Sequence, residues 1–330
     1  MTTKYRLQYI DIAKGIGIFL VVLGHVYRGN VVQNWLYSFH MPLFFFISGW
    51  LYNGNKVFES GYITFIKKKA RRFLVPYMVF ILMNYIYWAV VEQSYRAFDQ
   101  GPLWFLPVLL IVECCAILPI EWTNNNRKRT ATSLFILMVG LICVGGFQIA
   151  YSGIFGLIVR VYNGIVWYYT GFCLSRYSKG WIESLSHHRY GRLYVACFFM
   201  LNVLSGCSNG RVDMYLNRFN NVFLYIIAAS SGIFFCMGIA VLIGKNKALL
   251  YLGKYSLVIM CTHEPIKRAV IQVASIVTHV SSDALRNNIL IGLLFAVIVL
   301  LIEVVTVETL RFFSKSTINK KIHIFFEYIN

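Results

Sequence analysis

The amino-acid sequence predicts an all-α fold, a polytopic transmembrane helical bundle of about ten helices. Of the residues, 58% are hydrophobic, and the mean hydropathy is +0.63. Only 13% are charged, well below the roughly 25% of soluble domains. Apolar runs of about 20 residues recur along the chain, long enough to cross a bilayer as helices. These runs are continuous and do not alternate, which disfavours a transmembrane barrel.

We predict ten spans in order along the chain. Their bounds are 11–28, 35–53, 73–92, 102–120, 131–149, 154–174, 191–208, 221–244, 255–279 and 288–312. A very short turn near Tyr151 joins the fifth span to the sixth. The loops between the spans are short, so residues 1–330 are expected to form a single integral-membrane domain.

The positions of the basic residues predict the orientation. With the N-terminus in the cytoplasm, 23 of the 31 Lys and Arg residues fall on the inner side and five on the outer side. Cytoplasmic loops are enriched in Lys and Arg, so both termini are expected in the cytoplasm. This distribution explains the net charge of +18, and no nucleic-acid partner is expected. The eight cysteines show no CxxC spacing, and no metal is expected.

The first span, DIAKGIGIFLVVLGH, carries Asp11, Lys14 and His25 among apolar residues. An ionisable residue inside a bilayer costs about 2.5–3.5 kcal/mol and is usually functional. Asp11 and Lys14 are three residues apart and can pair on one helix face, which also suits a simple anchor at the membrane edge. His25 follows Lys14 by eleven residues, about 16 Å along a helix axis.

The second predicted span brings a further histidine to the same depth. His40 lies shortly after the outer loop and His25 shortly before it, so antiparallel neighbours would face each other with these rings. Histidine is the usual general base, since its pKa lies near neutrality. Lys14 at the inner mouth could hold a phosphate. A long donor with a charged head and a reactive tip, such as acyl-coenzyme A, fits this spacing. The simpler alternative for each histidine is a hydrogen bond to a carbonyl.

Several motifs together resemble the membrane-bound acyltransferase-3 family. They are the basic residue Lys14 separated by ten residues from His25, FHMPLFFFISGWLY in the second span, KKKARRFLVPY at 67–77, LWFLPVLLIVE at 103–113 and LGKYSLVIMCTHEP at 252–265. The chain is most similar to the branch that O-acetylates bacterial surface polysaccharides. The resemblance covers essentially the whole chain.

The resemblance implies an acyl donor, normally acetyl-CoA, on the cytoplasmic side. It implies as acceptor a hydroxyl of a glycan or lipid-linked sugar, for O-antigen, capsule or exopolysaccharide. It makes His25 the catalytic histidine, and Lys14 stands where many relatives have arginine. It implies a multi-pass protein of the bacterial inner membrane, surrounded by membrane lipids, and implies no oligomeric state.

Other polar residues in or beside the spans complete the candidate site. Arg71 and Arg72 either anchor the third span or bind the phosphates of coenzyme A. Glu113 either pairs with Arg160 or orients a catalytic histidine, because a lone buried carboxylate is costly. Trp104 belongs either to the aromatic belt of the membrane interface or to a sugar-stacking surface.

The ninth span contains the sequence HEPIKR at 263–268. So many polar groups predict a helix that breaks around a cavity, where His263 and Glu264 would bind substrate. Glu303 in the tenth span is the expected counter-ion of one of these bases.

Two functions are compatible with these sequence features. The first is an integral-membrane, acyl-CoA-dependent O-acetyltransferase, in which His25 acts as general base or briefly carries the acyl group, assisted by His40 and Glu113. The second is a transporter or exporter of a sugar or anionic solute, which uses the buried charges as a relay. Lys14, His25 and the inner basic residues favour the enzyme, because a transporter does not need them.

Overall fold

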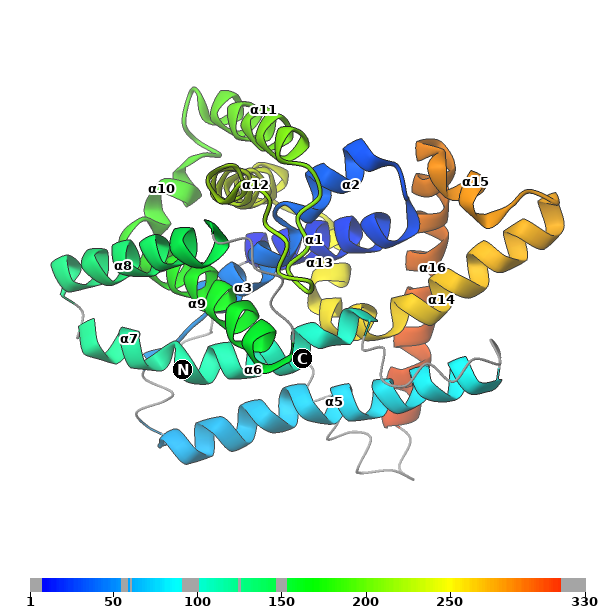
Figure 1. Cartoon of the computed structure of the whole chain (residues 1–330), viewed down its shortest axis with the longest axis horizontal. Coiled ribbons are helices and arrows are strands. Elements are labelled where there is room, and N and C mark those ends of the chain that lie inside the picture. The colour runs from blue at the N-terminus through cyan, green and yellow to red at the C-terminus, as the bar shows by residue number, and fades with distance from the viewer. Residues whose placement is uncertain are drawn as a thin grey trace. The chain divides into compact units, whose positions relative to one another are not determined.

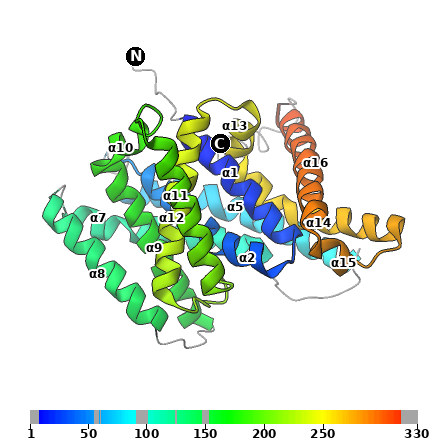
Figure 2. The same cartoon turned by 90° about the horizontal axis from the view of Figure 1, so that it is seen from above.

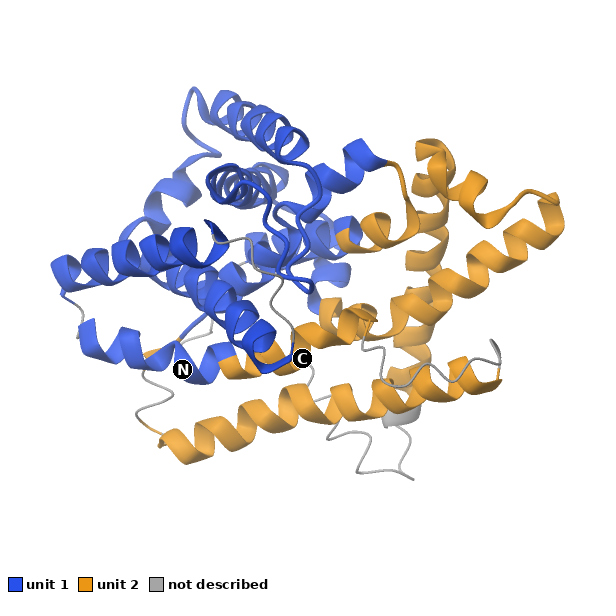
Figure 3. Cartoon of the chain, in the orientation of Figure 1, with its two compact units in different colours: residues 1–20, 30–52, 112–254 blue, residues 21–29, 53–111, 255–330 orange. Residues whose placement is uncertain are grey.

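A computed structural model of the chain describes residues 8–54, 59, 61–90, 101–123, 126–146 and 153–315. The secondary structure in these ranges is helical, apart from one isolated antiparallel bridge between Asp213 and Arg218. The chain divides into two compact units, shown in blue and orange in Figure 3. Unit 1 comprises Met1–Leu20, Asn30–Tyr52 and Val112–Lys254, and unit 2 comprises Val21–Gly29, Asn53–Ile111 and Tyr255–Asn330.

Unit 1 is built from closely packed helices (Figures 1 and 2). Two helices pass from one unit to the other, α1 (Gln8–Val26) and α6 (Phe105–Cys115). The others in unit 1 are α2 (Asn30–Tyr37), α3 (His40–Trp50), α7 (Ile117–Thr123), α8 (Arg127–Gly146), α9 (Gly153–Tyr177), α10 (Lys179–Ser184), α11 (Gly191–Asn209), α12 (Val222–Ile243) and α13 (Lys247–Lys254). The main pairings are α11 with α12 and α3 with α9.

Two glycines explain how closely α3 and α9 approach. A Cβ on Gly49 would lie 1.8 Å from the carbonyl oxygen of Tyr168, and one on Gly171 would lie 2.0 Å from that of Phe46. Small residues at such crossings let the backbones of membrane helices touch. The α3–α9 contact therefore depends on glycine from both helices.

In the described ranges, unit 2 contains the end of α1, the start of α6 and further helical segments. These are α5 (Tyr62–Val90), the 3₁₀ helix η1 (Gly101–Trp104), α14 (Ser256–Thr278), α15 (Ser282–Asn287) and α16 (Ile289–Lys315). In this unit α14 packs against α16, and the short α15 connects them.

Seven segments in the described ranges are long and apolar enough to cross a membrane. They are Gln8–Val26, Tyr62–Val90, Gly101–Thr123, Arg127–Gly146, Gly191–Asn209, Val222–Ile243 and Ile289–Phe312. Helices α9 and α14 reach similar lengths, with 25 and 23 residues, but carry more polar side chains. The all-helical fold with apolar helices of membrane-spanning length is thus confirmed in the described residues, whereas the number ten and the cytoplasmic placement of the termini stay predictions.

The prediction of one continuous span over 35–53 was wrong. Helix α2 ends at Tyr37 and α3 begins at His40, and Phe39 between them has φ −142° and ψ −19°, outside the helical region. Ser38 turns the chain by donating its hydroxyl to the carbonyl of Trp35. Pro42 follows in the first turn of α3, where its missing N–H is tolerated, whereas it would interrupt a longer helix.

Three other predicted boundaries change. The span expected over 73–92 begins at Tyr62, because the Lys and Arg run at 67–72 is itself helical, as these good helix formers allow. The span over 102–120 consists of η1, α6 and α7. The break expected within 255–279 is absent from the described α14, which runs on through Pro265. The turn near Tyr151 lies outside the described residues.

Candidate active site

Three side chains of unit 2 meet where α1 ends beside α14. His25 comes from the last turn of α1, and His263 and Glu264 come from α14. The His25 and His263 ring centres are 5.1 Å apart, and His25 Nδ1 lies 3.9 Å from Glu264 Oε2. The His25 side chain is 25% exposed, whereas His263 is fully buried. The His25 ring is therefore partly accessible, whereas the His263 ring beside it is not.

The carboxylate of Glu264 is held by two cations on its own helix. Lys267 Nζ donates to both carboxylate oxygens, at 2.7 and 2.8 Å, and Arg268 Nε donates to Oε1 at 2.9 Å. The Arg268 guanidinium also stacks on Trp88 of α5, 4.0 Å from the ring centre. Because Lys267 is only 6% exposed, its charge depends on Glu264 for compensation. The pairing explains why α14 carries these charges without breaking.

The tautomer of His263 follows from its hydrogen bond. Its Nδ1 lies 3.0 Å from the carbonyl oxygen of Ile259, one turn earlier, so Nδ1 carries the proton and donates it. The buried Nε2 has no hydrogen-bond partner among the described residues. A buried acceptor without a partner is costly and suggests a site completed by a bound group.

His25, His263 and Glu264 also have the residue types of a metal site, with one candidate ligand atom from each within 4.8 Å of the others. However, both oxygens of Glu264 already accept from Lys267, and Arg268 lies beside them. A divalent cation would have to displace these bonds and would be repelled by both cations. The electrostatics favour a carboxylate–imidazole pair over metal ligation.

This arrangement suits acid–base chemistry. An imidazole that takes a proton becomes a cation, and a fixed carboxylate beside it stabilises that cation. Glu264 occupies this position toward His25 and is itself fixed by Lys267 and Arg268. The site thus contains a partly exposed base and a preorganised counter-charge.

Lys14 and Asp11 lie in the part of α1 that belongs to unit 1. Lys14 Nζ is 3.8 Å from Asp11 Oδ1, which confirms the expected i,i+3 pair. Helix α13 packs on this turn so closely that a Cβ on Gly253 would lie 1.7 Å from the carbonyl oxygen of Asp11. Binding of a phosphate by Lys14 stays a prediction.

His40, also in unit 1, makes contacts of its own. Its Nδ1 donates to the carbonyl of Leu36 at 2.7 Å, and its ring packs edge-on against Tyr37. Arg211 stacks on the same Tyr37, 4.5 Å from the ring centre. This hydrogen bond to a backbone carbonyl is the simpler of the two alternatives that the sequence offered for His40. A contact of His40 with His25 stays a prediction.

The remaining sequence candidates are placed as follows. Glu113 is 4% exposed in α6, while Arg160 donates to the carbonyl of Gly156 and stacks on Tyr215. Trp104 is 7% exposed and packs edge-on against Phe105. Their functional roles stay predictions.

Arg71 and Arg72 lie within α5, where Arg71 is exposed and Arg72 is half-buried beside Phe73. Glu303 of α16 accepts a hydrogen bond from the Thr262 hydroxyl at 2.6 Å. Among the described residues, the hydrogen-bond partner of Glu303 is thus this hydroxyl and not one of the basic groups that the sequence suggested.

Sequence reasoning missed one residue of this region, Arg286 of α15. It donates to the carbonyl oxygens of His25 and Val26. Its only sequence signal was a cation in the loop before the last span.

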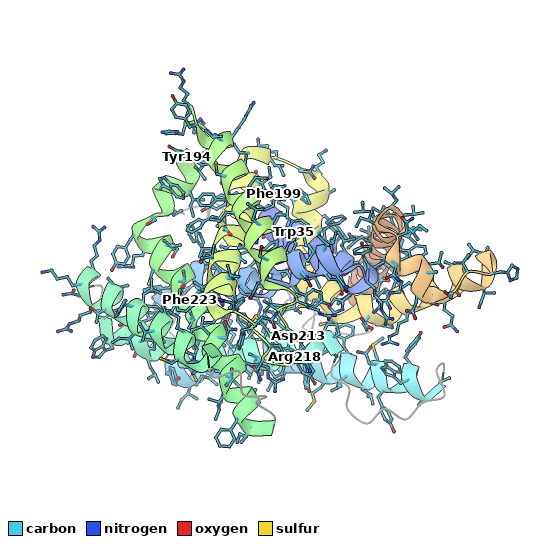
Figure 4. The ribbon with its side chains drawn as sticks, turned by 45° about the horizontal axis from the view of Figure 1, so that its top comes forward. Trp35, Tyr194, Phe199, Asp213, Arg218 and Phe223 are labelled. Atoms are coloured by element: carbon cyan, nitrogen blue, oxygen red, sulfur yellow. The ribbon has the colours of Figure 1, made fainter. Side chains whose placement is uncertain are left out.

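In unit 1 a second feature was missed, the ordered loop between α11 and α12. Figure 4 shows Asp213 and Arg218 side by side there, and their backbones exchange two hydrogen bonds.

Comparison with known proteins assigns the chain to a family. Residues 7–308 match the family Acyl_transf_3, described as an acyltransferase domain. The chain belongs to this acyltransferase family. The acyltransferase-3 resemblance noted in the sequence is thereby confirmed, and the region around His25, His263 and Glu264 is part of the acyltransferase domain.

Two curated relatives are nodulation proteins NolL. The chain is 31% identical to that of Sinorhizobium fredii over 121 residues, 30% of this chain and 33% of the relative. It is 38% identical to that of Mesorhizobium japonicum over 88 residues, 22% of each chain. The matches thus span a third or less of these relatives. No solved structure matches the chain.

Proposed function

We propose that this membrane acyltransferase is an O-acetyltransferase of the bacterial inner membrane. It moves an acetyl group from cytoplasmic acetyl-CoA to a hydroxyl of a cell-surface glycan, or of its lipid-linked precursor. The observation that carries the proposal is the partly exposed His25 beside the fixed carboxylate of Glu264, within an acyltransferase domain.

In the proposed reaction His25 accepts the proton of the acceptor hydroxyl. The hydroxyl oxygen bonds to the thioester carbonyl carbon, the carbon–sulfur bond breaks, and the proton passes from His25 to the coenzyme A sulfur. Glu264 stabilises the imidazolium between these two transfers. In the covalent variant of the reaction, a nitrogen of His25 bonds to the carbonyl carbon as the carbon–sulfur bond breaks, and coenzyme A leaves as the thiolate. The acceptor hydroxyl oxygen then takes the acetyl group from His25, and the hydroxyl proton goes to the coenzyme A thiolate.

The proposed donor and acceptor are those that the resemblance to the acyltransferase-3 family implies. Lys14, Arg71 and Arg72 are the proposed phosphate-binding residues for coenzyme A, and Trp104 and His263 the proposed acceptor-binding residues. Matching an acyltransferase family favours this function over the transporter.

The test is NMR of surface polysaccharide from cells that carry the wild-type protein, His25→Ala, His279→Ala or no copy. O-acetyl signals are expected with the wild type and with His279→Ala, because His279 is exposed at the end of α14. They are expected to disappear with His25→Ala while the protein still inserts in the membrane. An unchanged signal in the cells that lack the protein would contradict the proposed acceptor, and one with His25→Ala would contradict the proposed base.

A further inference from the structure

The connection between α14 and α16 binds the end of the helix that carries His25. Arg286 of α15 donates from Nε to the carbonyl oxygen of Val26 at 2.8 Å and from Nη2 to that of His25 at 2.6 Å. In the reverse direction, the backbone N–H of Arg28 donates to the carbonyl of Arg286 at 2.9 Å. All these residues belong to unit 2.

These hydrogen bonds give donors to backbone carbonyls that have none within the helix. The last carbonyls of a helix have no intrahelical donor and carry partial negative charge, which a cation stabilises. A guanidinium has several donors in one rigid plane, so a single Arg286 can bond two carbonyls at once. It therefore fixes both the position and the rotation of the last turn of α1.

The carboxylate that faces His25 lies on the helix that precedes α15. Glu264 lies on α14, and the chain runs from α14 through residues 279–281 into α15. The turn is itself ordered, because the Ser275 hydroxyl donates to the carbonyl of Val280 at 2.7 Å and Ser281 caps α15. Arg286 thus connects the backbone of His25 to the segment that positions Glu264.

We propose that Arg286 is a positioning residue for catalysis, which holds the His25 imidazole at its working distance from Glu264. The proposal rests on the proposed function of His25. A displacement of about 1 Å in a reacting group can cost about 100-fold in rate, so loss of this support should lower kcat without removing any group that touches substrate.

Arg28 offers a matched control in the same loop region. Its guanidinium pairs with Asp283 of α15, and both side chains are more than half exposed, at 52% and 74%. Exposed pairs contribute little to stability, and this one bonds no carbonyl of His25. A general need for a cation near α15 would affect Arg28 and Arg286 alike, whereas positioning affects Arg286 alone.

The experiment measures radiolabelled acetyl transfer from acetyl-CoA to a glycan extract of cells that lack the protein. The purified variants are Arg286→Ala, Arg286→Lys, Arg28→Ala and His25→Ala. For Arg286→Ala we expect kcat to fall about 100-fold with the KM for acetyl-CoA unchanged. Arg286→Lys should recover part of the rate, because an ammonium still donates to these carbonyls, and Arg28→Ala should match the wild type.

Wild-type kcat in Arg286→Ala, or equal losses in Arg286→Ala and Arg28→Ala, would overturn the positioning role. Should Arg286→Ala not fold, Arg286→Gln decides. Its amide can reach one carbonyl and lacks the charge, so it must be slower than Arg286→Lys, and equal rates would overturn the role. The His25→Ala arm separates the two proposals. If that variant transfers acetyl groups normally, the proposed role of His25 as the base fails, whatever Arg286 does; if the wild type transfers none, the proposed acetyltransferase function fails.

Discussion

At the scale of single residues, Glu264 joins two kinds of contact. Toward α1 it faces the His25 ring, and along α14 it accepts from Lys267 and Arg268. It therefore acts both as a counter-charge for His25 and as the partner of a buried lysine. These two tasks give Glu264 a larger expected mutational effect than a carboxylate that only stabilises a helix surface.

For Glu264→Gln we expect the transfer rate per folded molecule to fall by about 100-fold or more, because a neutral amide no longer stabilises the His25 imidazolium. The yield of folded protein should fall too, since Lys267 loses its counter-ion, a loss that costs about 3–5 kcal/mol in buried pairs. Rates are measured by acetyl transfer and normalised to the monodisperse fraction from size exclusion.

Glu308→Gln is the matched control for this substitution. Like Glu264, Glu308 pairs with an arginine of its own helix, here Arg311, three residues later. The Glu308 side chain, however, is 48% exposed. Its loss should change neither rate nor yield appreciably. If Glu264→Gln transferred acetyl groups as fast as Glu308→Gln, Glu264 would have no part in the chemistry.

The sequence predicted single residues of the site better than their partnerships. His25 stood out because a histidine in an apolar span requires an explanation, and His263 and Glu264 stood out for the same reason. Their meeting could not be predicted, because they lie near opposite ends of the chain and no local pattern encodes such a contact. Local reasoning predicted a contact of His25 with His40 from the hairpin of the first two spans, and that contact stays a prediction.

At the scale of helices, α1 and α13 pack with their backbones in direct contact. A Cβ on Gly253 would lie 1.7 Å from the carbonyl oxygen of Asp11, and one on Gly15 would lie 2.2 Å from that of Leu249. Neither neighbour is the end of a flexible side chain. The two helices must therefore move apart if either glycine is replaced.

We expect Gly253→Ala to lower the free energy of unfolding by about 1–3 kcal/mol, the usual range for overpacking. Gly180→Ala in α10 is the control, because a Cβ there meets nothing within 4 Å and alanine favours helix by up to about 1 kcal/mol. Thermal unfolding in detergent should thus shift in opposite directions for the two variants. A shift of the same sign and size would show that the α1–α13 contact is not close-packed.

Helix boundaries illustrate what the hydropathy pattern does and does not encode. The pattern located the apolar stretches, because twenty apolar residues in a row have few alternatives. It did not show that the stretch 35–53 is two helices, since that break depends on a serine hydroxyl and a proline within an otherwise apolar run. It also did not show that the basic residues at 67–72 extend α5, because helix formation there does not require apolarity.

At the scale of the whole molecule, the distribution of Lys and Arg predicts which ends of the helices face the cytoplasm. In a cysteine-free background, Ser186→Cys before α11 and Ser282→Cys in α15 are expected on opposite sides of the membrane. A membrane-impermeant maleimide should label Ser282→Cys in intact spheroplasts and label Ser186→Cys only after lysis. Labelling of both in intact spheroplasts would reject the predicted topology.

The ion pairs of α14 also bear on how the chain enters the membrane during synthesis. A charged residue at the centre of a span opposes insertion by about 2.5–3.5 kcal/mol. Lys267 and Arg268 reach Glu264 from three and four residues away on one helix, so they can pair as soon as that turn forms. They need neither α16, which the ribosome has not yet made, nor a docked α1. The segment can thus leave the translocon with its charges already largely neutralised, and His25 meets Glu264 only when the helices later assemble.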